Sequence, residues 1–164
     1  MKLITKTKHP GELNMLKTAN CVLAVLLITG ATIVAAETDL EGVKCVVSNK
    51  DASESVSTDY KKGKVYFCCD ECVSKFKSDS KKFEVKANHQ LVATKQYEQT
   101  ACPFSGRDID PEVHTTISGA KVRFCCSGCK RRVDSAKDDA ARMELIFTNK
   151  NFAKAFKIKS SDEG

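Results

Sequence analysis

The first apolar stretch of the chain is an uncharged run at residues 21–36, CVLAVLLITGATIVAA. Lys17 precedes this run, and small residues lead out of it to the acidic Glu37. A basic start, a short apolar core and a small-residue exit are typical of a secretory signal peptide, with cleavage expected after Ala36. The run is shorter than the roughly 20 residues that a membrane-spanning helix needs, although an uncleaved membrane anchor is the competing interpretation. We therefore predict a signal peptide over residues 1–36, a secreted or periplasmic protein, and no stable membrane insertion after cleavage.

Apolar and polar positions alternate in two later segments of the chain. The first segment has Val56, Thr58 and Tyr60 before a Lys-Gly turn, and Val65 and Phe67 after it. The second segment repeats the alternation around a Ser-Gly turn, at Val113, Thr115, Ile117, Val122 and Phe124. Period-two patterning on either side of a glycine turn predicts a β-hairpin in each segment.

The period changes to three or four residues after each hairpin. In the second copy, the apolar positions from Cys129 onward are Val133, Ala136, Ala140, Met143 and Phe147. This spacing predicts one amphipathic helix. The first copy has a shorter pattern and a further apolar segment, at Cys72, Val73, Phe76, Phe83 and Val85. Since each hairpin is followed by a helix, the predicted fold class is α+β.

Four cysteines accompany each hairpin and helix, and they recur at a constant offset of 57 residues. The two sets are Cys45, Cys68, Cys69 and Cys72, and then Cys102, Cys125, Cys126 and Cys129. A sulfur grouping duplicated with its spacing intact indicates a site, either for metal ligation, disulfide formation or redox exchange. We therefore predict tandem modules over residues 40–99 and 100–158, each binding its own ion, and a flexible tail over 159–164.

The small size of the modules favours the same chemistry. Each has about 60 residues and few large apolar side chains. Domains of this size have marginal cores and commonly gain stability from disulfides or a metal ion. A thiol at the start of a helix also meets free backbone N–H groups, which favour the thiolate that binds metal.

The segments YFCCDEC and RFCCSGC, each about 22 residues after a lone cysteine, resemble the TRASH and YHS family of treble-clef-like metal-binding modules. The segment CPFSGRDI at residues 102–109 is also similar to the opening of a related zinc module in a large-subunit ribosomal protein. The resemblance implies two treble-clef-like modules, each made of a cysteine knuckle, a β-hairpin and an α-helix. It places the obligate thiolates at Cys45, Cys68 and Cys72, and at Cys102, Cys125 and Cys129.

The chain departs from the family pattern at one position of each module. Four-cysteine members have a second cysteine three residues after the first, where this chain has Ser48 and Ser105. A serine hydroxyl is a poor ligand for a soft metal, so Cys69 and Cys126 are the candidates for a fourth ligand. Because adjacent residues of an extended strand point in different directions, a C-x2-C pair formed by these cysteines with Cys72 and Cys129 is the alternative ligand set.

The remaining polar features favour no other class of site. His89 and His114 have no counterpart in the other module, so both are expected to be structural residues and not ligands. Lys130, Arg131 and Arg132 are interpreted as a solvated helix face that also offsets thiolate charge.

The mature chain would have 23 basic and 20 acidic residues, because residues 1–36 hold four of the 27 basic and one of the 21 acidic ones. So small a net charge does not favour a nucleic-acid partner. No thioredoxin-like strand and helix, Ser/His/Asp set or carboxylate pair indicates an enzyme. We expect an exported metal-binding protein that holds zinc or copper(I), for a structural role or for heavy-metal sequestration or sensing, with another exported protein as a further candidate partner. A disulfide-stapled scaffold or a thiol–disulfide exchange protein is the alternative.

Overall fold

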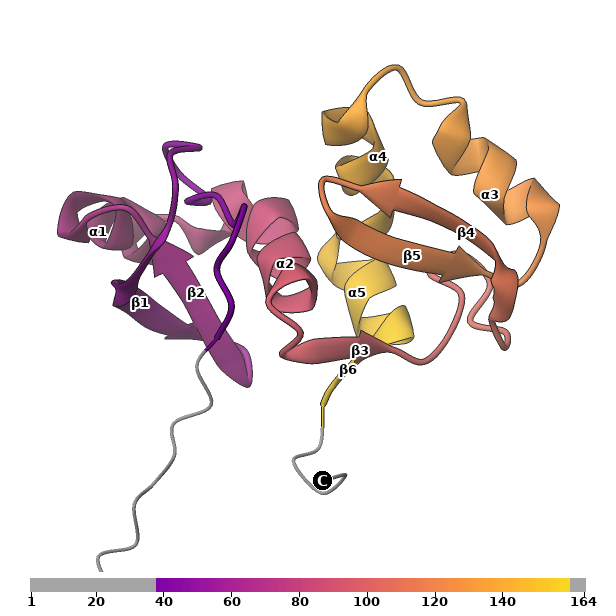
Figure 1. Cartoon of the computed structure of the whole chain (residues 1–164), viewed down its shortest axis with the longest axis horizontal. Helices are drawn as coiled ribbons and strands as arrows, with labels where there is room; N and C mark the ends of the chain where they lie inside the picture. Colours follow the sequence, from indigo (N-terminus) through magenta and orange to yellow (C-terminus); the bar gives the residue numbers. More distant parts are fainter. Residues whose placement is uncertain (1–37, 160–164) are drawn as a thin grey trace, which may run out of the picture. The chain divides into compact units, whose positions relative to one another are not determined.

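Two β-hairpins of the same design organise the fold, which we describe for residues 38–159 of a computed structural model (Figure 1). The first hairpin pairs β1 (Ser53–Tyr60) with β2 (Gly63–Phe67), and the second pairs β4 (Asp110–Ile117) with β5 (Ala120–Phe124). The predicted signal peptide and Cys21 lie outside the described residues. Both hairpins agree with the alternation of the sequence, and the mixed α+β class is confirmed.

The two hairpins share their register and their irregularity. Thr58 pairs with Val65 in the first, and Thr115 pairs with Val122 in the second. The register also shifts at the same place in both hairpins, between Ser53 and Ser57 in β1 and between Asp110 and His114 in β4. The 57-residue sequence repeat is therefore a repeat of backbone geometry as well.

Each hairpin runs directly into a short helix. In the first module the helices are α1 (Asp70–Ser78), the 3-10 helix η1 (Ser80–Phe83) and α2 (Glu84–Ala93). In the second module they are α3 (Ser127–Asp134), α4 (Asp139–Ile146) and α5 (Asn149–Ala155).

The prediction of one continuous helix after Cys129 is wrong. α3 ends at Asp134, and α4 begins anew at Asp139. Asp138 causes the break, because its extended backbone and its carboxylate, which accepts a 2.8 Å hydrogen bond from the Ala141 N–H, form an N-cap. The apolar spacing continues through the break because both helices pack against the same hairpin.

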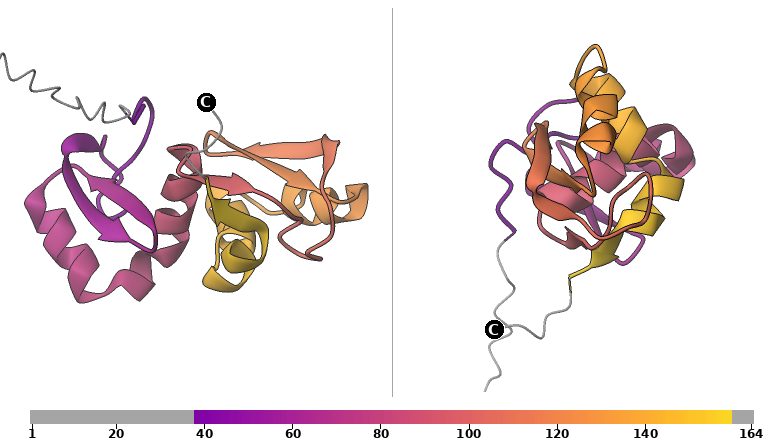
Figure 2. Two further views of the ribbon diagram at one scale, coloured as in Figure 1. Left: turned by 90° about the horizontal axis from the view of Figure 1, so that it is seen from below. Right: turned by 90° about the vertical axis from the view of Figure 1, so that its right-hand side faces the viewer.

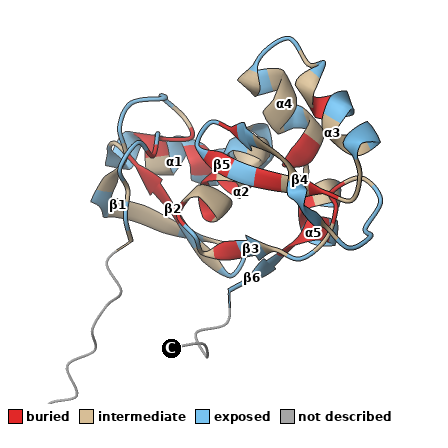
Figure 3. Cartoon of the chain, turned by 45° about the vertical axis from the view of Figure 1, so that its right-hand side comes forward, coloured by how far each residue is buried: buried red, intermediate tan, exposed pale blue. Residues whose placement is uncertain are grey.

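The two modules share one hydrophobic core. Figure 3 shows buried residues on β2, α2 and β5, and the fully buried side chains include Phe67, Leu91, Phe124 and Phe147. α2 of the first module contacts α4 and α5 of the second, as Figure 2 shows for α5. The amide of Asn88 on α2 is buried and donates a 2.8 Å hydrogen bond to the Phe147 carbonyl.

A third pair of strands joins the ends of the modules. β3 (Tyr97–Gln99) follows α2, and it pairs antiparallel with β6 (Phe156–Ile158) at the end of the second module. This pairing and the shared core argue against modules that fold independently, since each module completes part of the other.

Candidate metal centre

The first ligand of each site comes from a tight turn ahead of the hairpin. In the first module the Cys45 N–H donates to the Lys50 carbonyl at 2.7 Å, and the Asn49 N–H donates to the Cys45 carbonyl at 2.9 Å. Cys102 forms the same turn in the second module, where Gly106 replaces Asn49. Asn49 and Gly106 both have a positive φ, 61° and 71°, a conformation that asparagine and glycine tolerate best. The turn buries the cysteine side chain, which is 1% exposed for Cys45.

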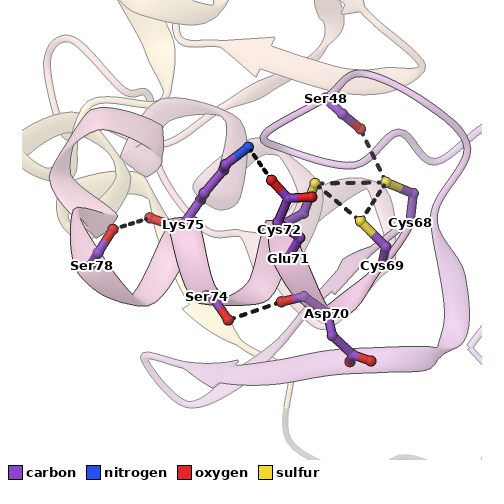
Figure 4. A network of polar contacts seen from close by, with 9 residues as sticks. All are labelled: Ser48, Cys68, Cys69, Asp70, Glu71, Cys72, Ser74, Lys75 and Ser78. Atoms are coloured by element: carbon purple, nitrogen blue, oxygen red, sulfur yellow. Dashed lines mark hydrogen bonds and ion pairs between the residues drawn. The ribbon is translucent and has the colours of Figure 1, made fainter.

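The second and third ligands come from the junction between hairpin and helix. Cys68 directly follows β2, and Cys72 lies in the first turn of α1. Their sulfur atoms are 3.7 Å apart (Figure 4), and the Sγ atoms of Cys45, Cys68 and Cys72 all lie within 4.8 Å of one another.

The second module repeats this convergence. The sulfur atoms of Cys102, Cys125 and Cys129 also lie within 4.8 Å of one another, and the Cys125 and Cys129 sulfurs are 3.8 Å apart. Sulfur ligands lie about 2.3 Å from tetrahedral zinc, which puts neighbouring sulfurs about 3.8 Å apart. In each cluster one sulfur pair therefore has the spacing of neighbouring zinc ligands, and the third sulfur lies within 4.8 Å of both.

The extra cysteine of each module lies beside its cluster. Cys69 is the N-cap residue of α1 and is exposed, with its sulfur 3.7 Å from that of Cys68 and 3.6 Å from that of Cys72 (Figure 4). Cys126 is the N-cap residue of α3, and its sulfur is 3.9 Å from that of Cys125. Neither belongs to the group of sulfurs that lie within 4.8 Å of one another.

A serine hydroxyl faces each cluster from the position of the missing family cysteine. Ser48 Oγ is 3.1 Å from Cys68 Sγ, and Ser105 Oγ is 3.2 Å from Cys125 Sγ. Each hydroxyl also accepts a backbone N–H two residues ahead, from Lys50 at 3.4 Å and from Arg107 at 3.2 Å. Each hydroxyl therefore lies within hydrogen-bond distance of its cysteine sulfur and can donate to a thiolate at that position.

The thiols of one cluster differ strongly in acidity. Burial acts to raise the pKa of Cys45, but the hydroxyl and backbone N–H of Ser48 and the backbone N–H of Cys68 outweigh it and lower that pKa to about 7. The same balance lowers the pKa of Cys102 to about 6. Burial and the neighbouring sulfurs raise the pKa of Cys72 and of Cys129 to about 12. A metal-free cluster therefore ionises readily at its knuckle cysteine, whereas the helix cysteine needs a cation to lose its proton.

A guanidinium group distinguishes the second centre. Arg107 Nη2 donates a 3.3 Å hydrogen bond to Cys125 Sγ, and this contact raises the pKa of Arg107. Two of the three basic residues expected to offset thiolate charge have other partners, since Lys130 pairs with Asp134 and the Arg132 guanidinium lies 4.5 Å from the Phe104 ring centroid. Sequence reasoning missed Arg107, although it lies within the quoted CPFSGRDI segment.

A glutamine side chain connects the turn that holds Cys45, and another the turn that holds Cys102, to the hairpin of the same module. Sequence reasoning missed both glutamines. Gln90 on α2 accepts the Tyr66 N–H at 2.7 Å, and it donates to the carbonyls of Tyr66 and Lys44, each at 3.0 Å. Gln99 on β3 makes the same contacts with the equivalent residues of the second module, Arg123 and Ala101, at 2.7–2.9 Å. The residue that steadies the second centre thus lies at the end of the first module's sequence.

The two histidines lie apart from the sulfur ligands. His89 Nε2 is 3.0 Å from the Ile117 carbonyl, and its ring packs edge-on against Phe147 with centroids 5.1 Å apart. His114 Nδ1 is 3.2 Å from the Pro111 carbonyl. Both contacts are structural, in agreement with the sequence interpretation.

No family model, curated protein or solved structure matches this chain. Between residues 38 and 159, the helices are all too short or too polar to cross a membrane.

Proposed function

We propose that this chain is an exported protein that binds one soft metal ion in each of two three-thiolate centres. The ligands are Cys45, Cys68 and Cys72 in the first centre, and Cys102, Cys125 and Cys129 in the second. The observation that carries the proposal is the convergence of three sulfurs from three separate elements, repeated in both modules at ligand spacing. In keeping with the family resemblance, the centres belong to modules of the TRASH or YHS type.

Metal binding accounts for this geometry better than disulfide stapling does. A disulfide uses two sulfurs and brings them to about 2.05 Å, so a third sulfur converging on the same point has no role in it. A metal ion uses all three. It also supplies the positive charge that the high pKa of Cys72 demands before that thiol ionises.

Zinc and copper(I) are the two ions that suit these ligands. Zinc accepts thiolates but completes a tetrahedron, so a water or another ligand would take its fourth position. Copper(I) favours soft thiolates and suits the three-sulfur set directly. A copper(I) centre would serve sequestration or sensing, whereas a closed zinc centre would serve folding, and neither role requires catalysis.

Native mass spectrometry of the chain, loaded separately with zinc and with copper(I), tests the proposal. We expect two ions of added mass that are lost on denaturation. The variant Cys72→Ser should retain one ion and Cys72→Ser/Cys129→Ser none, whereas Ser74→Ala on the same helix should retain two. Deficits of about 2 Da per disulfide that persist after denaturation, with no added metal, would replace the proposal with a disulfide scaffold.

Export has its own test. Chain recovered from its native host should begin at or near Glu37, because the apolar run of residues 21–36 ends in small residues. Full-length chain recovered from the cytoplasm would contradict export and leave the metal centres unaffected.

A further inference from the structure

One sulfur in each cluster is left unused by the three-thiolate centre. In the first module this sulfur belongs to Cys69, which is exposed, while Cys72 beside it is 6% exposed. The two sulfurs are only 3.6 Å apart (Figure 4). An accessible thiol in contact with a buried ligand is placed to receive an oxidising reagent from solvent and to pass the oxidation to the ligand.

We infer that Cys69 is a site of thiol modification and that a disulfide between Cys69 and Cys72 releases the metal ion from the first centre. The inference rests on the proposed metal centre. Once Cys72 is lost to a disulfide, only Cys45 and Cys68 remain as thiolates, and two thiolates do not complete the ligand set.

The reaction balances with a low-molecular-weight disulfide, RSSR, as oxidant. The Cys69 thiolate attacks one sulfur of RSSR, which forms a mixed disulfide and expels one RS⁻. The Cys72 thiolate then attacks Cys69 Sγ, which breaks the mixed disulfide and expels the second RS⁻ as the metal ion leaves. Two protein thiolates are oxidised by two electrons and RSSR is reduced to two RS⁻, so an excess of thiol reverses the sequence.

Geometry selects Cys72 over Cys68 as the partner of Cys69. Adjacent residues have Cα atoms 3.80 Å apart, which is shorter than the 4.4–6.8 Å usual for disulfides. Cys69 and Cys72 enclose a C-x2-C segment at the start of α1, which avoids that restriction. Their sulfurs need to approach by about 1.5 Å to reach the disulfide length of about 2.05 Å.

The second module provides an internal comparison. Cys126 is half-buried where Cys69 is exposed. The first centre therefore reacts with solvent oxidants before the second.

The experiment treats the zinc-loaded full chain with oxidised glutathione in the absence of air. A chromophoric chelator reports the released zinc, and peptide mapping without reduction locates the disulfides. We expect one zinc ion to leave first, a linkage between Cys69 and Cys72, and recovery of binding on reduction. Cys69→Ser should slow this first release at least tenfold while still binding two zinc ions, and Cys126→Ser is the matched control that should leave the first release unchanged.

Three results would overturn the inference. Unchanged release from Cys69→Ser would show that Cys69 does not mediate the reaction, and a first disulfide elsewhere would show a different pair. Faster zinc loss from Cys69→Ser without oxidant would show that Cys69 is a ligand. If the wild-type chain binds no metal, the proposed function fails, and mapping of the oxidised metal-free chain still decides whether the Cys69 and Cys72 pair forms first.

Discussion

Two residues of one cluster, Cys45 and Cys72, have opposite shifts in acidity because their partners differ. Cys45 receives hydrogen bonds from Ser48 and from backbone N–H groups, so its pKa falls to about 7. Cys72 is buried among other sulfurs, so its pKa rises to about 12. Metal must therefore displace the Cys72 proton on binding, and at low pH it must displace the Cys45 proton as well.

Metal affinity should accordingly fall as the pH falls. Because the pKa of Cys72 is raised to about 12, this thiol releases a proton on binding throughout the range, so metal affinity should fall by at least about tenfold for each pH unit of acidification. The decrease in affinity per pH unit should become larger at the first centre below pH 7, which is about the pKa of Cys45. At the second centre it should become larger only below about pH 6, the pKa of Cys102. Chelator competition between pH 5 and 9, with Cys129→Ser to isolate the first centre and Cys72→Ser the second, measures both slopes. An affinity independent of pH would contradict thiolate ligation.

Ser48 offers a second prediction at this scale. Replacement by alanine removes the hydroxyl that lies 3.1 Å from Cys68 Sγ. A hydrogen bond to a charged group contributes about 1.5–3 kcal/mol, so zinc affinity at the first centre should fall about 10- to 100-fold in Ser48→Ala. Ser48→Cys should instead raise zinc affinity, because it supplies a fourth thiolate. Competition titrations of both variants, with the second centre disabled by Cys129→Ser, check the order; an affinity of Ser48→Ala equal to that with Ser48 present would show that the hydroxyl does not stabilise the centre.

At the scale of elements, glutamine side chains protect the second strand of each hairpin. Strands at a sheet edge leave backbone groups unpaired, and Gln90 pairs those of Tyr66. Gln99 does the same for Arg123, and Gln96 does so for Lys64. These hydrogen bonds fix the strand that ends beside Cys68 or Cys125. Gln90 and Gln99 also donate a hydrogen bond to the carbonyl of the residue before Cys45 or Cys102.

The three glutamines differ in how deeply their hydrogen bonds are buried, and this predicts how much each contributes to stability. The Gln90 contacts with Tyr66 are buried, those of Gln99 are part-buried and those of Gln96 are exposed. Because an unsatisfied buried polar group costs about 1–3 kcal/mol, Gln90→Ala should lower the free energy of unfolding most, Gln99→Ala less and Gln96→Ala least. Chemical denaturation of the three variants measures this order. A Gln96→Ala effect as large as that of Gln90→Ala would refute the role assigned to buried contacts.

At the scale of the whole molecule, the tandem modules depend on each other. The contacts that join them include the pairing of β3 with β6 and the packing of α2 against α4 and α5. The sequence boundary at residue 99 separates β3 and Gln99 from the module that they complete. The repeat alone suggests that the two halves bind metal independently, whereas these contacts lead us to expect weaker binding by each half when the other is removed.

Fragments test this dependence. A chain of residues 100–160 lacks both β3 and the Gln99 contacts, so we expect it to bind zinc at least tenfold more weakly than the full chain does, with fewer slowly exchanging amides. Extending the fragment to begin at residue 94 should recover part of the loss, and mixing with residues 40–99 should recover more. Zinc competition and hydrogen exchange give both readouts; a 100–160 fragment that binds as tightly as the full chain would show that the module is autonomous after all.

The sequence by itself determined the hairpins, the duplicated design and the grouping of the cysteines. Alternation of side chains is a local property of strands, and the 57-residue offset carries register and ligand spacing from one copy to the other without reference to distant residues. The repeat therefore groups Cys45, Cys68, Cys69 and Cys72 as members of one site, and the structure places the sulfurs of Cys45, Cys68 and Cys72 within 4.8 Å of one another.

Only the tertiary structure decided what depends on contacts between distant residues. The break between α3 and α4 is different, because the Asp138 cap that causes it is a local contact with Ala141, and the apolar spacing that continues through it gave no sign of a break. Arg107 reaches Cys125 across 18 residues and Gln99 reaches Arg123 across 24, and neither contact has a periodic signature in the sequence. The pairing of β3 with β6 joins segments almost 60 residues apart, so it too arises only when the chain folds and the two modules share one core.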